Sequence, residues 1–293
     1  MAMNPTVDQV VDAFGIATEE NLADPQRHQQ VVELPAEGEL WIAGDLHDHR
    51  RNLDRILNAI DLGADPARHL VLHELIHGDR YDKNGADGSW ETLYRVAELK
   101  CDFPHQVHFL LANHDLAQIY GEGIMKGGMS VCEAFNSGLK RDFPGGFGIV
   151  NAALTEFLLS FALGVRTANG LFICHSLPTD QQIDGFDYGV FSRPLTGADY
   201  LRKTGAVYQL VWGRNISPAS AAIFADKVAA RLLITGHQPQ DSGFFVNGEH
   251  HLIIATDHNH GVIVRADLAR TYTMETLVDC IEKVAALGVD LEG

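Results

Sequence analysis

Glu39-Leu40-Trp41-Ile42-Ala43-Gly44-Asp45-Leu46-His47 is the most informative segment of the chain, because an apolar run of strand length ends there at two possible metal ligands. Three further apolar runs end in a similar way. Residues 107–112 lead into Asn113-His114-Asp115, residues 171–174 lead into His175, and residues 232–235 lead into Gly236-His237. Ligand sites of α/β sheets assemble at strand ends, so the four runs predict one shared site.

The composition is that of a globular protein. Apolar residues make up 46% of the 293 residues, which is ample for a sizeable core. The formal net charge of −17 argues against general nucleic-acid binding, which needs a basic surface. It also looks unfavourable for an enzyme that handles phosphate, unless bound divalent cations reverse the charge locally.

Neither a membrane span nor a signal peptide is evident. No apolar run approaches the roughly eighteen residues of a membrane-spanning helix. Residues 1–8 lack the basic start and apolar stretch of a signal peptide, so we expect a cytoplasmic protein without a membrane partner. The four cysteines form no CxxC pair, which argues against a thiolate zinc site and against a disulfide framework.

Predicted strands and helices alternate along the chain. After the first strand, an amphipathic helix ends near Gly63, a second strand starts near His69, and a helix over residues 90–100 leads back to the strand at Val107. This order predicts parallel strands joined by right-handed crossovers.

We expect one domain over residues 39–270 with a segment at each end. Residues 1–38 are predicted to be an N-terminal extension that is helical, and the glycine-rich residues 116–150 to form a cap or rim. Residues 271–293 are predicted to form a C-terminal amphipathic helix that packs on the domain. The apolar face of that helix would consist of Met274, Leu277, Ile281, Val284 and Leu287.

The polar residues at the strand ends supply oxygen and nitrogen donors but no sulfur. Asp45 and His47 stand two residues apart, so both can turn toward one ion from a loop that leaves a strand. Such a donor set suits Mn²⁺, Fe or Zn²⁺ rather than Ca²⁺. Two ions about 3.5–4 Å apart can clamp the attacking and leaving oxygens of a phosphoryl transfer.

These motifs resemble those of the calcineurin-like metallophosphoesterase superfamily, and most closely its phosphoprotein-phosphatase branch. The similarity to that branch lies in residues 151–159 with the following His175-Ser176-Leu177-Pro178, in Trp212-Gly213-Arg214, and in Gly236-His237-Gln238-Pro239, which lacks the second histidine of the wider superfamily. The resemblance spans about residues 39–268. It implies an α/β fold, a four-layer α/β/β/α sandwich of two mixed sheets.

The resemblance also implies two divalent metal ions, manganese first, with iron or zinc as alternatives. Asp45 and His47 would hold one ion. Asn113, His175 and His237 would hold the other.

The implied reaction is hydrolysis of a phosphomonoester, on a protein or a small molecule, by metal-activated water. His114, oriented by Asp115, would be the general acid that protonates the leaving oxygen. Arg214 would bind the phosphate, with a surface or core-capping role as its alternative.

The carboxylate that bridges the two ions has two candidates. The family usually has Gly-Asp-x-x-Asp-Arg-Gly after its second strand. If the strand covers residues 69–72, Glu74 stands in the bridging place, whereas the lettering of Gly78-Asp79-Arg80 favours Asp79. The second register would place Glu74 and His77 inside a central strand, where an unpaired charge is costly, so we favour Glu74.

Two phosphate-binding arginines of protein phosphatases have no counterpart at the matching positions. In the Glu74 register, Gly78 replaces the second-motif arginine, and Leu111 replaces the arginine before Asn-His. Asp48 replaces the small residue that follows the first-motif histidine. The basic residues that could compensate are Arg51, Arg80, Lys83 and Arg193.

The other histidines and two other functions complete the alternatives. His69, His105 and His108 are assigned to structure or surface, and His73, His77, His258 and His260 stay unassigned. Residues 257–261 could hold a separate metal, although the family has a turn there. The alternative functions are hydrolysis of a dinucleoside polyphosphate or other nucleotide, and a non-catalytic scaffold that keeps the fold.

Overall fold

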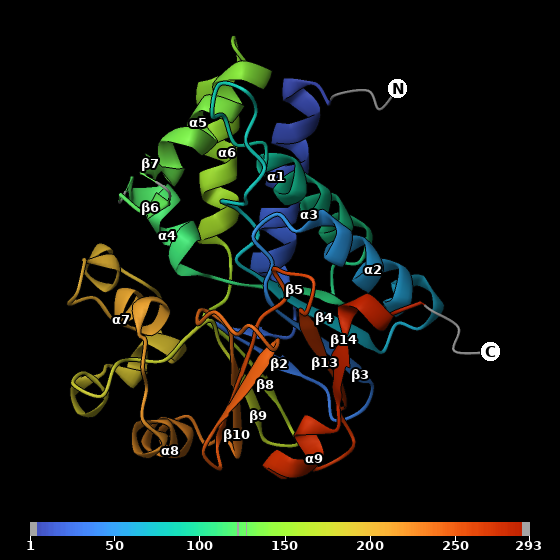
Figure 1. The fold of residues 1–293 in the computed structure, drawn as a ribbon, viewed down its shortest axis with the longest axis vertical. Coiled ribbons are helices and arrows are strands. Elements are labelled where there is room, and N and C mark those ends of the chain that lie inside the picture. The colour runs from blue at the N-terminus through green and yellow to red at the C-terminus, as the bar shows by residue number, and fades with distance from the viewer. Residues whose placement is uncertain (1–4, 122, 127, 289–293) are drawn as a thin grey trace.

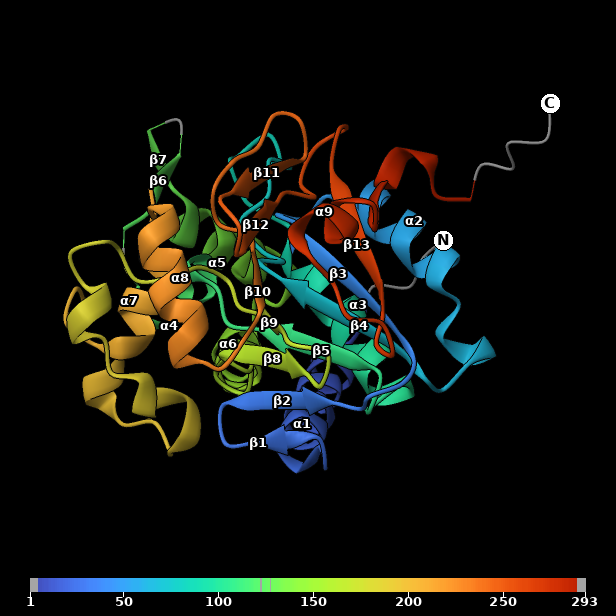
Figure 2. The same cartoon turned by 90° about the horizontal axis from the view of Figure 1, so that it is seen from below.

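Two mixed β-sheets lie face to face between layers of helices in the computed structural model, which describes residues 5–121, 123–126 and 128–288 (Figure 1). Helices α1, α3 and α6 pack together on the outer side of the five-stranded sheet, and α8 packs on strands of the seven-stranded sheet (Figure 2). This is the four-layer α/β/β/α arrangement that the resemblance implies.

The five-stranded sheet has the order β14-β13-β3-β4-β5. Its members are β3 (Glu39–Asp45), β4 (Arg68–His73), β5 (Val107–Leu110), β13 (Val262–Asp267) and β14 (Ile281–Lys283). Strands β3, β4 and β5 are parallel, while β13 and β14 are antiparallel additions. Every residue of β5 and all but the first of β4 are buried, which explains their continuous apolar sequences.

The seven-stranded sheet has the order β1-β2-β8-β9-β10-β12-β11. Its members are β1 (Arg27–His28), β2 (Val31–Leu34), β8 (Gly164–Thr167), β9 (Leu171–Ile173), β10 (Leu232–Thr235), β11 (Phe244–Asn247) and β12 (His251–Ile254). Strands β9, β10 and β12 are parallel neighbours. A separate hairpin pairs β6 (Met125–Lys126) with β7 (Met129–Ser130).

Nine α-helices fall within the described residues. They are α1 (Val7–Ala23), α2 (Arg50–Ile60), α3 (Trp90–Asp102), α4 (Asn113–Tyr120), α5 (Val131–Asp142), α6 (Phe147–Leu159), α7 (Ala206–Trp212), α8 (Pro218–Lys227) and α9 (Met274–Val278). None of the helices in the described part of the chain has both the length and the apolar character needed to cross a bilayer.

The space between the sheets is filled by aliphatic side chains from both. The five-stranded sheet contributes Leu40, Ile42, Val71, Leu110 and Val264, and the seven-stranded sheet contributes Val165, Leu171, Ile173, Ile234 and Leu252. This apolar layer stops at the carboxyl ends of β3, β4, β9 and β10, where buried polar residues begin.

The N-terminal segment contains one helix and two strands of a sheet. Helix α1 starts with a capping box in which the Thr6 hydroxyl accepts from the N–H of Gln9. Strand β2 then pairs in parallel with β8, so residues 31–34 belong to the seven-stranded sheet. The run Val31-Val32-Glu33-Leu34 was too short to indicate a strand by itself.

The prediction of a C-terminal helix over residues 271–293 is wrong for the residues that the structure describes, which end at Gly288. Helix α9 ends at Val278, and β14 then pairs with β13. Leu277 packs between the two sheets, whereas Val284 packs in the core that also contains Ile56 of α2. The apolar residues whose spacing resembles that of a helix therefore pack in two different cores.

Segment 116–150 is more regular than predicted, because it contains the β6–β7 hairpin, all of α5 and the start of α6. Its role as a cap or rim stays a prediction.

His251, the first residue of β12, ties three elements together from a buried position. Its Nε2 lies 2.8 Å from Thr235 Oγ1 at the end of β10, and the Asn247 amide lies 3.2 Å from its Nδ1. Burial lowers the pKa of His251 to about 4.

Acidification should therefore destabilise the fold through His251. Between pH 6.5 and about 4 the unfolded chain binds a proton at this ring that the folded chain does not. The free energy of unfolding should fall as the pH falls through this window, by up to roughly 3 kcal/mol. Urea unfolding of chelator-treated protein between pH 4 and 7 measures the slope.

The replacement His251→Gln should make that slope less steep without abolishing it, because the lowered pKa values of His175 and His237 remain. The matched control is His28→Gln, which changes a solvent-exposed imidazole and should leave the slope as it is. An unchanged slope in the His251 variant would show that another group causes the acid sensitivity.

Candidate metal centre

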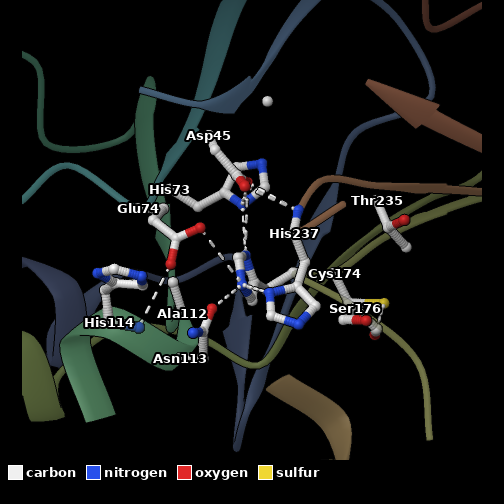
Figure 3. A network of polar contacts seen from close by, with 12 residues as sticks. Asp45, His73, Glu74, Ala112, Asn113, His114, Cys174, Ser176, Thr235 and His237 are labelled. Carbon is white, nitrogen blue, oxygen red and sulfur yellow. Dashed lines mark hydrogen bonds and ion pairs between the residues drawn. The ribbon is translucent and has the colours of Figure 1, made fainter. Parts of the chain in front are cut away.

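The predicted strand ends converge on one buried site between the two sheets (Figure 3). Asp45 ends β3, and Glu74 follows β4. Asn113 begins α4, three residues after the last residue of β5. His175 and His237 each stand two residues beyond the end of a strand of the other sheet, β9 and β10. The site is thus built from both sheets.

One group of donor atoms surrounds Nε2 of His175. This nitrogen lies 2.8 Å from Asn113 Oδ1, 3.2 Å from His237 Nδ1 and 3.7 Å from Glu74 Oε2. Two ligands that bind one ion at about 2.1 Å and at right angles lie about 3 Å apart. The four donors therefore have the separations expected around a single cation.

A second group faces the same oxygen of Glu74 from the other side. His47 Nε2 lies 3.6 Å from Glu74 Oε2 in a group that also contains His114, whereas Asp45 falls in a third group, with His73 and His175. Nδ1 of His47 lies 3.0 Å from the Ile76 carbonyl, which can only accept a hydrogen bond. The proton of a neutral His47 therefore sits on Nδ1, and Nε2 is left with a lone pair directed into the site.

The electrostatics of the site call for a cation. Burial and the neighbouring Asp45 raise the pKa of the Glu74 carboxyl well above its ordinary value. Burial would also raise the pKa of Asp45, but His73, the neighbouring Glu74 carboxyl group, His47 and the N–H of His237 together lower it. Two adjacent buried carboxylates can both ionise only beside compensating positive charge. The residues therefore fit a site for divalent metal ions.

The histidine ligands are held in the form that binds metals. Burial lowers the pKa of His175 well below its ordinary value, and burial together with Arg214 lowers that of His237 to about 3. Both rings are thus neutral at ordinary pH, and neutral imidazole is the metal-binding form.

Geometry favours Glu74 over Asp79 as the bridging candidate. Strand β4 ends at His73, which is the register that puts Glu74 first after the strand. Three groups of possible ligands occur among the described residues, and Glu74 belongs to two of them, whereas Asp79 belongs to none. Asp79 instead lines a cavity beside His47. The metal roles themselves stay predictions.

The expectation that Asp115 orients His114 is wrong. One oxygen of Asp115 accepts from the N–H of Ala112 at the start of α4, and the other has no hydrogen-bond partner. Burial raises the pKa of this carboxyl to about 7. Asp115 therefore caps its own helix.

His77 is the residue that contacts His114 instead. The two Nδ1 atoms lie 2.9 Å apart, and the other nitrogen of His77 lies 3.1 Å from the side-chain oxygen of Gln118. The sequence analysis left His77 unassigned, although the family pattern could have indicated this role. In the Glu74 register, His77 occupies the place of the second Asp in the family's Gly-Asp-x-x-Asp.

Asp48 and Gly78 explain why the second-motif arginine is absent. A Cβ on Gly78 would lie 2.6 Å from the Asp48 Cβ and 2.6 Å from the His47 carbonyl oxygen, so no side chain fits there. The Asp48 carboxylate accepts from Arg50 Nε at 3.1 Å and from Arg80 Nε at 2.6 Å. Asp48, which stands where the family has a small residue, thus binds two arginine side chains.

The predicted phosphate-binding residues lie in different places. Arg214 is exposed directly after α7, and its charge reaches His237. Arg51 and Arg80 line a cavity of about 340 Å³ that also includes His47. Arg193 is paired with Asp187 and Asp199, and Lys83 does not line this cavity.

The remaining histidines have structural partners. His69 and His108 are buried and lie 3.2 Å apart through ring nitrogens, which agrees with a structural role. His258 Nε2 lies 2.9 Å from the Gln240 carbonyl, and its Nδ1 accepts from the N–H of His260. Residues 257–261 contribute to none of the ligand groups found in the described ranges.

Backbone strain concentrates at this site. Ten non-glycine residues in the described chain have positive φ, and five of them surround the centre. They are His47 (43°), Asp48 (56°), Glu74 (50°), His77 (61°) and His237 (65°). Such conformations are costly and occur mostly where function requires them.

Gly236 permits the closest approach in the site. A Cβ at this position would lie 2.2 Å from Asp45 Oδ1 and 2.5 Å from His73 Cε1. The next residue, His237, donates its N–H to both oxygens of Asp45 at 2.9 Å. Because Gly236 has no side chain, the possible ligands from the two sheets can lie this close together.

Comparisons with known proteins agree with this architecture, although no family model matches the chain. The curated "Probable serine/threonine-protein phosphatase" of Encephalitozoon cuniculi is 24% identical over 242 residues, which are 75% of this chain and 46% of the relative. The chain thus spans about half the length of that relative.

Two groups of solved structures share the fold. A protein serine/threonine phosphatase from Saccharomyces cerevisiae, similar to human phosphatase PP5, aligns with TM-score 0.67 at 14% identity over 89% of this chain and 82% of its own. A cold-active protein-tyrosine phosphatase of a Shewanella species aligns with TM-score 0.59 at 12% identity over 91% and 84%. Both likenesses establish the fold.

Replacing Gly236 by alanine should weaken metal binding. The added Cβ must displace the Asp45 carboxylate or the His73 ring, so we expect the affinity for Mn²⁺ to fall by about tenfold or more. Isothermal titration of metal-stripped protein measures it. Gly185→Ala is the control, because a Cβ there meets nothing within 4 Å. Equal affinities of the two variants would contradict the steric explanation.

Proposed function

We propose that this chain, which has the fold of the calcineurin-like metallophosphoesterase superfamily, is a metal-dependent phosphoesterase that hydrolyses phosphomonoesters. The observation that carries the proposal is the position of Glu74 Oε2, which lies 3.6 Å from His47 Nε2 on one side and 3.7 Å from His175 Nε2 on the other. A single buried carboxylate oxygen placed between two donor groups is suited to a pair of divalent ions, of which we propose manganese.

Bound ions would supply an activated water and would neutralise the charge that develops on the phosphoryl oxygens. Asp45 and His47 would hold one ion, and Asn113, His175 and His237 the other, with Glu74 between them. The net formal charge of −17 is then compatible with an anionic substrate, because the local charge at the site is set by the ions.

His114 is the proposed general acid for the leaving oxygen. Its ring is half-buried and lies beside His47, with ring centroids 4.7 Å apart. The backbone N–H of His114 donates to Glu74 Oε1 at 3.3 Å, which fixes the residue relative to the metal ligands. His77, held by Gln118, would position the imidazole by accepting its Nδ1 proton, and this leaves Nε2 to serve the substrate.

Arg214 is the proposed phosphate ligand. Its exposed guanidinium stands on the His237 side of the site, where the substrate phosphate can reach it from solvent. A planar guanidinium can bind two phosphate oxygens at once.

A nucleotide substrate is a second candidate because of the cavity beside His47. Its volume of about 340 Å³ is more than a phosphate group fills, and Arg51 and Arg80 line it. An Arg51→Gln variant that loses hydrolysis of a dinucleoside tetraphosphate but keeps that of a phosphopeptide would favour this class. Equal effects on both substrates would remove the preference.

The first test of the proposal is hydrolysis of p-nitrophenyl phosphate by metal-stripped protein titrated with Mn²⁺. We expect activity to rise with Mn²⁺ and to be absent in Asp45→Asn, which removes a ligand charge. Tight Mn²⁺ binding without activity would point to a narrow substrate pocket. No binding and no activity would favour a scaffold that has kept only the fold.

Replacing His114 by alanine should separate acid catalysis from metal binding. Turnover of phenyl phosphate, whose leaving group needs a proton, should fall by roughly 100-fold. Turnover of p-nitrophenyl phosphate should fall much less, because p-nitrophenolate leaves without protonation. Metal content, measured by atomic emission, should stay the same. Equal losses on the two substrates would contradict the assignment of His114 as the acid.

A further inference from the structure

The cavity beside His47 is bordered by a buried carboxylate that the proposed reaction does not use. The side chain of Asp48 is fully covered by its neighbours. Its Oδ1 accepts from Arg50 Nε at 3.1 Å and from the hydroxyl of Thr92, and its Oδ2 accepts from Arg80 Nε at 2.6 Å. A buried carboxylate with this many donors holds its partners in fixed positions.

The two arginines that bind Asp48 differ in the donors that remain to them. Arg50 uses all three of its nitrogens, because its terminal nitrogens donate to Glu91 at 2.5 Å and to the Gly88 carbonyl at 3.1 Å. Arg80 uses only Nε, and its two terminal nitrogens form no hydrogen bond with the described part of the chain. Arg50 is therefore structural, whereas Arg80 has the end of its guanidinium available for a ligand.

The cavity connects Arg80 with the metal centre. Its volume is about 340 Å³, and its lining includes His47, which belongs to one of the two donor groups around Glu74, together with Arg80 and the exposed Arg51. The Arg80 side chain is half-exposed, so a molecule can approach it from solvent. A substrate that is bound at the metal centre can thus extend one of its groups to Arg80.

Arg80 and the proposed phosphate ligand Arg214 lie on different sides of the centre. Arg214 is on the side of His237, and its charge contributes to the lowered pKa of that ring. Arg80 is on the side of His47, and Glu74 links the donor groups of the two histidines. A phosphate that reacts beside Arg214 therefore leaves Arg80 for another group of the same substrate.

The lining of the cavity favours a group that is recognised by directed hydrogen bonds. It contains three arginines and three aspartates, so overall charge alone does not attract an anion there. A guanidinium that is fixed through Nε can direct its two terminal nitrogens to two oxygens of one phosphate. The ammonium group of a lysine cannot reproduce this planar arrangement.

We propose that Arg80, held by Asp48, is a specificity-determining residue that binds a second phosphate group of the substrate, so that bisphosphorylated small molecules are preferred to monophosphates. Asp48 is a positioning residue, because it acts through Arg80. The inference rests on the proposed function, since it names the substrate class of the same centre.

The test compares alkanediol bisphosphates of increasing chain length with alkyl monophosphates of the same length, in the Mn²⁺-loaded full chain. In the wild type, kcat/KM for the best bisphosphate should exceed that for its monophosphate by about tenfold to 100-fold. Arg80→Gln should reduce this ratio to the statistical advantage of two phosphates. Arg80→Lys should restore only part of it, because the charge returns without the planar pair of donors.

A matched control is Arg95→Gln. Arg95 is an exposed arginine that pairs with Asp54 and does not line the cavity, so its replacement should leave the ratio as it is. A wild-type ratio in Arg80→Gln would overturn the proposal. So would an equal loss in Arg95→Gln, because the effect would then not depend on the cavity.

Asp48→Asn tests the positioning role. Asparagine keeps the size of the side chain and tolerates the φ of 56° at this residue, but it lacks the charge that holds Arg80. The ratio should fall in this variant although Arg80 is intact. General damage to the centre would lower both substrates in proportion and keep the ratio. An unchanged ratio would therefore overturn the role of Asp48.

Binding of the corresponding phosphonates, which are not hydrolysed, gives a readout that is independent of activity. Isothermal titration of the Mn²⁺-loaded wild type should show the bisphosphonate bound about tenfold or more tightly than the monophosphonate, and Arg80→Gln should remove the difference. Equal affinities in the wild type would overturn the inference.

The two measurements together separate this inference from the proposed function. A wild type that hydrolyses monophosphates and bisphosphates without preference would overturn the inference alone. A wild type that hydrolyses neither would overturn the proposed function, and the phosphonate affinities would then decide by themselves whether Arg80 binds a second phosphate.

Discussion

Two buried carboxyl groups, Asp45 and Glu74, lie close enough where the two sheets meet to shift each other's pKa, and the rest of the site depends on this pair. Side by side in a medium of low polarity, they cannot both be ionised without a cation. The surrounding groups are arranged as a cation would require. His47 directs the lone pair of its Nε2 inward, and the Asn113 amide oxygen points to the same site.

Several residues that carry these donors adopt unfavourable backbone conformations, which a purely structural core would not require. Glu74 and His237 adopt the left-handed region, which is unfavourable for residues with a side chain. Gly236 avoids a side chain so that Asp45 can approach the loop after β10. The apolar layer between the sheets makes this strain tolerable, because it fixes the strand ends from which the loops depart.

The sequence was sufficient to predict the strands that lead to Asp45, Asn113, His175 and His237 and to expect these residues at one place, but it did not indicate β2 or β14. It was insufficient where a residue's role depends on a partner far along the chain. Asp115 stands next to His114 in sequence but caps its own helix, while His77 reaches that ring across the site. The C-terminal spacing likewise resembled a helix, although its apolar residues enter two different cores.

The most direct test of a metal pair bridged by Glu74 is an anomalous difference map from crystals of the Mn²⁺-loaded protein. We expect two peaks about 3.5–4 Å apart, both within bonding distance of Glu74. One of them should also be bound by His47 and the other by His175. A single peak, or a pair bridged by Asp79 with Glu74 unbound, would contradict the proposed site.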